Sequence, residues 1–274
     1  MGALSAHDNY SESRSVIPRK SAAEIAHIRA SCHLVALVKQ TLEAAIRPGV
    51  TTLELDALAE QIIRAHGAVP AFKGYRGFPA SICASANARV VHGFPDRNPL
   101  QEGDILSVDV GVRRNGYYGD GAFTVGIGRI RPELEHLLAT VRACLDAGIQ
   151  QARVGGHLSD ISHAIQTCAQ SQGFSVVREF GGHGIGRALH EEPFIPNHGS
   201  PGQGPRLRSG FVLAIEPIIN LGNPQIHIAE DGWTTTTCDQ SPSAHCEHTV
   251  LLTPAGPEIL TLLPAFHQQV KATL

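Results

Sequence analysis

The sequence lacks the features of a membrane or secreted protein. No apolar run approaches the roughly 18 residues that a membrane-spanning helix needs. The first 16 residues contain neither the charged n-region nor the apolar h-region of a signal peptide. Charged residues make up only 17% of the chain and the net charge is −3, so no attraction to nucleic acid or to a membrane surface is expected. These absences predict a cytoplasmic protein without a nucleic-acid or membrane partner.

Motifs of several common enzyme classes are also missing. The chain has no HExxH, no G-x-S-x-G and no G-x-x-x-x-G-K-[ST], which removes the commonest zinc-protease, serine-hydrolase and phosphate-loop classes. Its six cysteines are scattered and form no CxxC pair, a density far below that of a disulfide-stabilised scaffold. We therefore expect the cysteines to be reduced and mostly structural.

What is present is the composition of a folded globular protein. The chain has 274 residues, of which 42% are hydrophobic, and a mean hydropathy of −0.03. These values exclude a disordered or fibrous chain. Residues 1–18 are polar and aperiodic and are predicted to form a flexible tail, and residues 19–274 to form a single domain.

Two pairs of helices are predicted, and the second pair repeats the first. Capping boxes open the first two helices, and the predicted helices span residues 21–46, 51–66, 132–152 and 160–172. Gly49 recurs as Gly155 and Gly67 as Gly173, an offset of 106 residues in both cases. Strand-type sequence follows each pair of helices. The pattern predicts an α+β domain with an internal pseudo-two-fold repeat, in which an antiparallel sheet is backed by helices.

Two aspartates are predicted to lie together on one hairpin. Asn115-Gly116 is a strong two-residue turn signal, and a turn centred there places Asp109 opposite Ala122. Asp109 and Asp120 then share a face as diagonal neighbours. Two such carboxylates would repel each other unless a cation lies between them.

Two further carboxylates and one histidine complete the candidate set. Glu216 lies in an apolar run, where a charge is costly unless it is paired or bound to a metal. Glu247 lies in the predicted strand 244–252 and shares its face with His245. His183 lies between glycines that would let a ligand approach closely. The set suits two divalent ions, although each carboxylate taken alone could equally be a turn or surface charge, and the glycines could equally form a phosphate loop.

Three segments and the aspartate pair then carry a family resemblance. They are AIEPIIN, DGWTTTTCDQSPSAHCEHTVLLT, GGHGIGRALHEEP, and Asp109 with Asp120. Over about residues 20–262 the chain resembles a type I methionine aminopeptidase of the pita-bread (creatinase/aminopeptidase-like) metallopeptidase family. The resemblance implies a hydrolase that removes the initiator methionine from nascent proteins co-translationally, through attack of metal-activated water on the first peptide bond.

The resemblance also implies a role for each candidate ligand. Asp109 would chelate one metal ion, His183 and Glu216 would hold the other, and Asp120 and Glu247 would bridge both. Two divalent ions per chain are thus expected. Oxygen-rich ligation with a single imidazole favours manganese, iron(II) or cobalt, with zinc left open. Glu216 is the expected proton shuttle between the water and the leaving amine.

Substrate-side residues are implied in the same way. His92 in VVHGFP would lie near the N-terminal amine of the substrate, and His190 in ALHEEP would hydrogen-bond the scissile carbonyl or the developing oxyanion. Four residues would form an apolar methionine slot, namely Tyr75, Phe78, Cys83 and Trp233. The chain departs from the family pattern at Leu189, where bacterial relatives usually carry an aromatic residue, and at Phe72, where many carry a small thiol.

Two other functions stay open on the residues alone. An Xaa-Pro aminopeptidase or dipeptidase of the same fold would share the five ligands, but such relatives generally carry an extra N-terminal domain, and only about 20 residues precede the first predicted helix. A catalytically inactive peptide-binding or nucleic-acid-binding relative would be expected to have lost at least one ligand. The resemblance favours a monomer that acts on N-terminal methionine peptides and nascent chains and meets the ribosome transiently.

Overall fold

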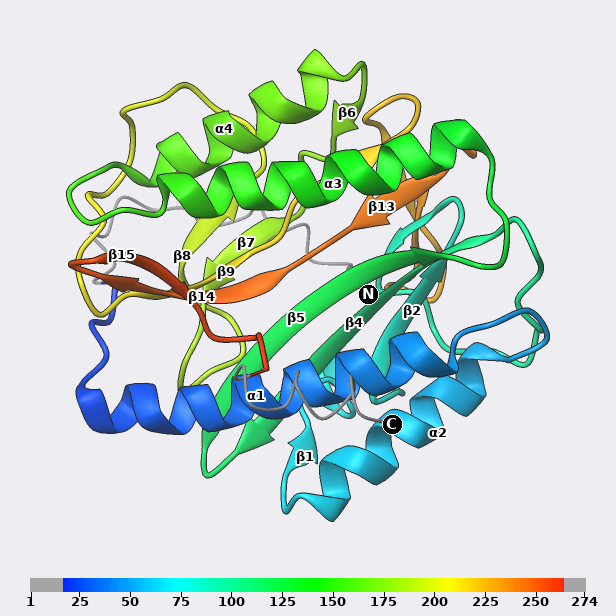
Figure 1. Cartoon of the computed structure of the whole chain (residues 1–274), viewed down its shortest axis with the longest axis horizontal. Helices are drawn as coiled ribbons and strands as arrows, with labels where there is room; N and C mark the ends of the chain where they lie inside the picture. The colour runs from blue at the N-terminus through cyan, green and yellow to red at the C-terminus, as the bar shows by residue number, and fades with distance from the viewer. Residues whose placement is uncertain (1–16, 264–274) are drawn as a thin grey trace, which may run out of the picture.

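Two pairs of helices lie along opposite sides of the molecule, and the strands lie between them (Figure 1). The computed structural model describes residues 17–263. The predicted tail therefore falls almost wholly outside the described residues. One side carries α1 (Ala22–Ala45) and α2 (Thr52–Ala65), and the other carries α3 (Pro132–Gln151) and α4 (Leu158–Ser171).

The first two helices begin where the sequence predicts. The Ser21 side chain accepts a hydrogen bond from the backbone N–H of Glu24 and caps α1, and the Thr51 side chain does the same for Glu54 in α2. In each case the glutamate side chain accepts the cap residue's own N–H. These reciprocal bonds satisfy N–H groups that the first turn of a helix leaves free.

The last helix begins two residues earlier than predicted. Asp160 is the third residue of α4, and its Oδ2 accepts the backbone N–H of His157 at 2.7 Å. The aspartate therefore closes the cap from inside the first turn. Sequence patterning alone places Asp160 at the start of the helix.

The internal repeat is visible in the backbone. Gly49 and Gly155, which follow the two long helices, have φ of 90° and 94°, and Gly67 and Gly173, which follow the two short ones, have φ of 67° and 82°. Such left-handed conformations favour glycine. The predicted pseudo-two-fold repeat is confirmed at the four positions where the chain leaves a helix.

Every strand pairing is antiparallel, as predicted. In the predicted hairpin, Asp109 lies opposite Ala122 and Gly111 opposite Asp120. The sheet that contains the hairpin consists of β1 (Val69–Pro70), β4 (Ile105–Arg114) and β2 (Ile82–Ala86), with β5 (Tyr117–Gly126) paired to β4. The short 3-10 helix η1 (Tyr75–Gly77) follows β1.

Residues 17–263 form three further sheets. The largest has the order β15 (Gly256–Ile259), β14 (His248–Thr253), β9 (Val212–Ile215), β7 (Gly181–Gly184) and β8 (Glu191–Pro196). A three-stranded sheet has the order β13 (Ser243–His245), β10 (Ile218–Asn220) and β6 (Ser175–Val176). Another has the order β11 (Ile226–Ile228), β12 (Thr235–Thr237) and β3 (Arg89–Val91).

The predicted strand 244–252 and the apolar run that contains Glu216 are each interrupted at a carboxylate. Glu216 and Pro217 separate β9 from β10, and Cys246 and Glu247 separate β13 from β14. Pro217 has no N–H to give to a ladder, and the N–H of Glu247 goes to the carbonyl of Ala122 in β5 at 3.0 Å. The prediction of one strand over 244–252 is therefore wrong.

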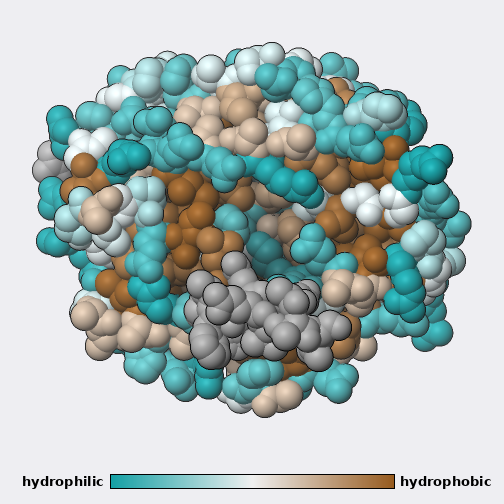
Figure 2. All heavy atoms as spheres, in the orientation of Figure 1, coloured by the Kyte–Doolittle hydropathy of each residue, from teal (hydrophilic) through white to brown (hydrophobic). Residues whose placement is uncertain are grey.

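Each helical pair covers its own hydrophobic core. One core joins α1 and α2 to β2 and β4, and the other joins α3 and α4 to β9, β10, β13 and β14. Over residues 17–263, no helix has the length and apolarity to cross a membrane. Figure 2 shows that the visible face is hollowed near its centre, with hydrophilic surface at depth and hydrophobic surface on either side.

Candidate metal centre

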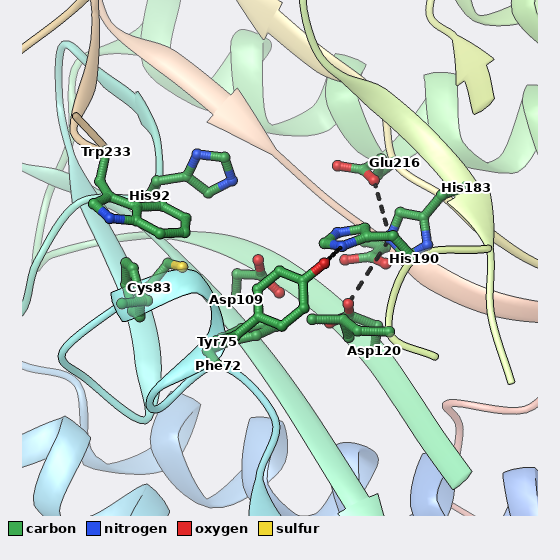
Figure 3. Close-up of a pocket in the computed structure, with 13 residues that line it drawn as sticks. Phe72, Tyr75, Cys83, His92, Asp109, Asp120, His183, His190, Glu216 and Trp233 are labelled. Carbon is green, nitrogen blue, oxygen red and sulfur yellow. Dashed lines mark hydrogen bonds and ion pairs between the residues drawn. The ribbon is translucent and has the colours of Figure 1, made fainter. Parts of the chain in front are cut away.

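One pocket brings together every site residue that the sequence predicts. Trp233, His92 and Cys83 lie on one side of it, and Glu216, His183 and His190 lie on the other (Figure 3). Its lining residues are Phe72, Tyr75, Phe78, Cys83, His92, Asp109, Asp120, His183, Leu189, His190, Glu216, Trp233 and Glu247. The two departures from the family pattern, Leu189 and Phe72, are thus part of the same pocket.

His183 is oriented toward the carboxylates by its own strand. Its Nδ1 lies 2.9 Å from the carbonyl of Gly184, an acceptor, so Nδ1 carries the proton and Nε2 is left as a free base. Nε2 lies 3.9 Å from Oδ2 of Asp120 and 3.7 Å from Oε1 of Glu216 (Figure 3). A Cβ at Gly182 would lie 2.3 Å from the carbonyl oxygen of Ala214, so the glycine lets β7 and β9 approach closely here. The ring therefore presents a metal-ligating nitrogen to the acidic residues.

The carboxylates form a buried acidic cluster. Asp120 is 3% exposed and Glu247 is 2% exposed. Candidate ligand atoms of Asp120, His183 and Glu247 all lie within 4.8 Å of one another. Within residues 17–263, the buried Oδ1 of Asp109 and Oε1 of Glu247 have no hydrogen-bond partner. Buried, unpartnered carboxylate oxygens are costly without a cation, and hard oxygen donors suit divalent ions, so the residues fit a metal centre.

Burial and mutual repulsion control the protonation of this cluster. Burial first, and then the charges of Glu247, Asp109 and Glu216, raises the pKa of Asp120 well above its usual value. Burial and nearby carboxylates also raise the pKa of Glu216 and of Glu247. Burial lowers the pKa of His183 to about 4, so its imidazole is neutral near pH 7. A neutral imidazole is the form that ligates a metal, and a bound cation would relieve the repulsion that raises the pKa of the neighbouring carboxyl groups.

His92 is held in an uncommon backbone conformation beside the pocket. Its φ is 58°, a left-handed value that is rare for residues other than glycine and clusters at functional sites. A Cβ on the next residue, Gly93, would lie 2.4 Å from the carbonyl oxygen of Ala84. The ring meets that of Trp233 edge to face at 5.8 Å. Burial lowers the pKa of His92 to about 4, so it can accept or donate as a neutral imidazole.

His190 is fixed by a tyrosine from the opposite half of the fold. The Tyr75 hydroxyl lies 2.9 Å from Nδ1 of His190 (Figure 3). The His190 ring also meets the His183 ring at 4.4 Å between centroids. Tyr75 lies in η1, between β1 and β2, and His190 directly precedes β8. This pair therefore connects the two halves of the molecule beside the acidic cluster.

Aromatic rings form the apolar part of the pocket. Phe78 contacts Trp233 edge to face at 5.1 Å and Phe72 at 6.5 Å. Phe72 occupies the space above Gly111, where a Cβ would come within 2.4 Å of the ring. Cys83 is buried and pairs in register with Asp109, so its position at the end of the slot beside the acidic cluster follows from the β2–β4 pairing.

Two residues that contact the centre were not among the predicted site residues. Lys39 in α1 donates from Nζ to the carbonyls of Ala122 at 2.9 Å and Glu247 at 3.2 Å. His245 lies with its Nε2 3.4 Å from Oε2 of Glu216. The signal for Lys39 is a charged residue on the apolar stripe of the first predicted helix, and the signal for His245 is its shared face with Glu247.

Comparison with known proteins shows the family to which this chain belongs. Residues 26–254 match the model for metallopeptidase family M24. A methionine aminopeptidase from Clostridium perfringens is 48% identical over 89% of this chain and 98% of its own length. A solved methionine aminopeptidase from Rickettsia prowazekii is 40% identical, covers 90% of this chain and all of its own, and superposes with a TM-score of 0.89.

More distant structures share the fold alone. The Xaa-Pro dipeptidase from Bacillus anthracis superposes with a TM-score of 0.72 at 20% identity and is matched over 62% of its own length. The pita-bread fold expected from the sequence is confirmed by these neighbours and by the α+β architecture of the chain. The chain belongs to metallopeptidase family M24 and, within it, to the methionine aminopeptidases.

Proposed function

We propose that this chain hydrolyses the first peptide bond of peptides and nascent chains that begin with methionine, using two divalent metal ions. The observation that carries the proposal is the junction of an acidic cluster and an aromatic slot in one pocket, with His92 and His190 beside the junction. An exopeptidase needs such a closed slot for one side chain next to the group that activates water.

The metal ligands are those that the family resemblance implies, and the close approach of Asp120, His183 and Glu247 supports them. Asp109 would hold one ion, His183 and Glu216 would hold the other, and Asp120 and Glu247 would contribute to both. When bound, such a pair of ions supplies Lewis acidity and lowers the pKa of a water molecule toward neutrality. Manganese, iron(II) and cobalt suit this oxygen-rich set best.

The remaining roles belong to side chains of the pocket. Glu216 accepts a proton from the attacking water and passes it to the leaving amine, a role suited to a carboxyl with a raised pKa. His190, whose Nδ1 is engaged by Tyr75, directs its other nitrogen to the scissile carbonyl. His92 receives the substrate amine, and the rings of Phe72, Phe78 and Trp233 contact the thioether side chain.

The setting of the reaction is part of the same proposal. Residues 19–274 act as a single catalytic domain, working as a monomer in the cytoplasm and meeting the ribosome transiently while chains are synthesised. The relatives from Clostridium perfringens and Bacillus subtilis match this chain over 98% of their own length, which supports a single domain.

Peptide hydrolysis tests the proposal. Protein reconstituted with Mn(II), Fe(II) or Co(II) is given Met-Gly-Ser, Leu-Gly-Ser and Ala-Pro-Ser, with Asp109→Ala as the control. We expect cleavage of Met-Gly-Ser well above that of Leu-Gly-Ser, no cleavage of Ala-Pro-Ser, and loss of activity in the control. Cleavage of Ala-Pro-Ser instead would retain the metal centre and overturn the specificity. Bound ions without any hydrolysis would indicate a binding protein.

A further inference from the structure

Glu216 lies between two imidazoles, of which only one belongs to the assigned ligands. Nε2 of His183 lies 3.7 Å from Oε1 of Glu216, and Nε2 of His245 lies 3.4 Å from Oε2. The two carboxylate oxygens therefore face different rings. An ion held jointly by His183 and Glu216 would use Oε1, which leaves Oε2 toward His245.

The position of His245 is fixed by backbone contacts. Its N–H donates to Oγ1 of Thr124 at 3.0 Å, and the Thr124 hydroxyl donates back to its carbonyl at 2.6 Å. Since that hydroxyl has only one proton, the Ser107 hydroxyl, 2.7 Å away, must be the donor to Thr124. His245 also pairs with Ile218, two residues beyond Glu216. The imidazole thus projects from a rigid site.

Among the described residues, Nε2 of His245 has no partner other than the Glu216 carboxylate. The residue is 3% exposed, and its Nε2 makes no hydrogen bond to any other described residue. The contact with Glu216 is slightly longer than a typical N–H···O bond and would need only a small movement of the carboxylate to close. Buried donors in folded proteins are almost always paired. A fixed imidazole aimed at one oxygen of a metal-ligating carboxylate is the arrangement that orients such ligands.

We propose that His245 is a positioning residue of the metal centre, which donates Nε2–H to Oε2 of Glu216 and thereby holds Oε1 toward the ion shared with His183. The inference rests on the proposed ligand set. It adds a residue that acts through Glu216 and contacts neither substrate nor metal.

Substitutions of His245 separate the effect of a hydrogen-bond donor that can reach Glu216 from the effect of filling the space of the imidazole. Glutamine carries an N–H₂ donor on a side chain long enough to approach Glu216, asparagine carries the same donor on a shorter one, and leucine carries none. Metal-free wild type, His245→Gln, His245→Asn and His245→Leu are titrated with Co(II), followed by calorimetry and by the visible absorption of the bound ion. Near-ultraviolet circular dichroism checks the fold, and the Gln and Asn pair decides the question if the Leu variant does not fold.

The expected pattern is selective. All folded variants bind two ions, His245→Gln stays within about threefold of the wild type, and the Asn and Leu variants lose about 10- to 100-fold in affinity for one ion only. The absorption spectrum keeps its coordination signature in every variant. With Met-Gly-Ser, kcat falls in the Asn and Leu variants while KM stays near the wild-type value, because the methionine slot is unchanged.

Three results would overturn the inference. Equal affinities in all four proteins would show that Glu216 needs no support from His245, while the proposed function would stand. A spectral change in His245→Gln that indicates loss of a nitrogen ligand would make His245 a ligand itself. A wild-type protein that binds no Co(II) would contradict both the inference and the proposed function, so the two failures are distinguishable.

Discussion

The backbone N–H of Cys246 donates to the carbonyl of Pro217 at 3.3 Å, so the two interrupted strands meet at their interruptions. Pro217 follows Glu216 and Cys246 precedes Glu247. This contact therefore brings the two segments that carry Glu216 and Glu247 next to each other. The interruptions release both residues from regular sheet geometry, which would send neighbouring side chains to opposite faces.

The Tyr75 hydroxyl is expected to assist catalysis through His190. Tyr75→Phe removes the contact at 2.9 Å to Nδ1 and leaves the ring in place. One hydrogen bond is worth about 0.5–1.5 kcal/mol, so we expect kcat for Met-Gly-Ser to fall about 3- to 10-fold with little change in Tm. His190→Ala should cost more, about 100-fold or above, because it removes the donor to the oxyanion. An unchanged kcat in Tyr75→Phe would show that His190 needs no such support.

Lys39 is expected to stabilise the metal-free fold. Its ammonium joins the carbonyls of Ala122 and Glu247 beneath the acidic cluster. Lys39→Met keeps the length of the side chain but leaves the Glu247 carbonyl without this donor, so the free energy of unfolding should fall by about 1–3 kcal/mol. Gln40→Met, on the same helix, serves as the control and should change it by less than about 0.5 kcal/mol. Urea unfolding in the presence of a chelator measures the free energy of unfolding of both variants. Equal decreases in Lys39→Met and Gln40→Met would contradict the role of Lys39.

The contribution of the acidic cluster to the stability of the metal-free protein should decrease as pH rises past the pKa that its carboxyl groups have in the unfolded chain. Burial raises the pKa of Asp120, Glu216 and Glu247, so the folded state holds protons that the unfolded state has already released. Such groups stabilise the fold below their unfolded pKa, and this stability is lost as pH rises through the folded pKa. Bound metal ions replace these protons and remove the effect.

Thermal unfolding of the wild type and of Asp120→Asn at about pH 5 and about pH 8 checks this prediction. The increase in Tm on adding Mn(II) should be larger at the higher pH, where fewer protons compete for the ligands. Asp120→Asn removes one of the titrating groups and should flatten the decline of the metal-free protein. A metal-free wild type whose pH dependence matches that of Asp120→Asn would show that Asp120 does not hold a proton in the folded state.

Leu189 is expected to shape the methionine slot. It is buried, lines the pocket and directly precedes His190. Leu189→Ala enlarges the slot and should lower kcat/KM for Met-Gly-Ser by about 10-fold, since a few methylenes in an apolar pocket are worth about 1–3 kcal/mol. The ratio of kcat/KM for Phe-Gly-Ser to kcat/KM for Met-Gly-Ser should rise, because the larger slot admits a larger side chain. Leu189→Met conserves volume and should stay close to the wild type. Competition between the two peptides measures the ratio directly, and an unchanged ratio in Leu189→Ala would exclude this role.

Local signals in the sequence predict much of the fold and leave the long-range contacts unpredicted. Capping boxes, helix-ending glycines and the Asn115-Gly116 turn are short-range features, and they place the first two helices and the register of Asp109 with Ala122 correctly. The interruption at Glu247 depends on a bond to Ala122, more than a hundred residues away, and no periodicity in the sequence shows it.

The same limit applies to the site. The residues alone indicate the five candidate ligands, and the resemblance adds the pocket residues and a role for each. The structure brings all of them into one pocket, and the roles stay predictions. Neither the residues nor the resemblance marks Lys39 or His245 as part of the site. The helical stripe does include Lys39, but only the folded chain shows that its ammonium meets two carbonyls beneath the cluster.

The measurement that tests the central claim most directly is a titration of metal-free protein with Mn(II) or Co(II), in which methionine release from Met-Gly-Ser is followed as ions are added. We predict no hydrolysis in the presence of a chelator, activity that rises and saturates by two ions per chain, and none in Asp109→Ala at any ion concentration. Full hydrolysis by chelator-treated protein, or none by protein that holds two ions, would contradict the account.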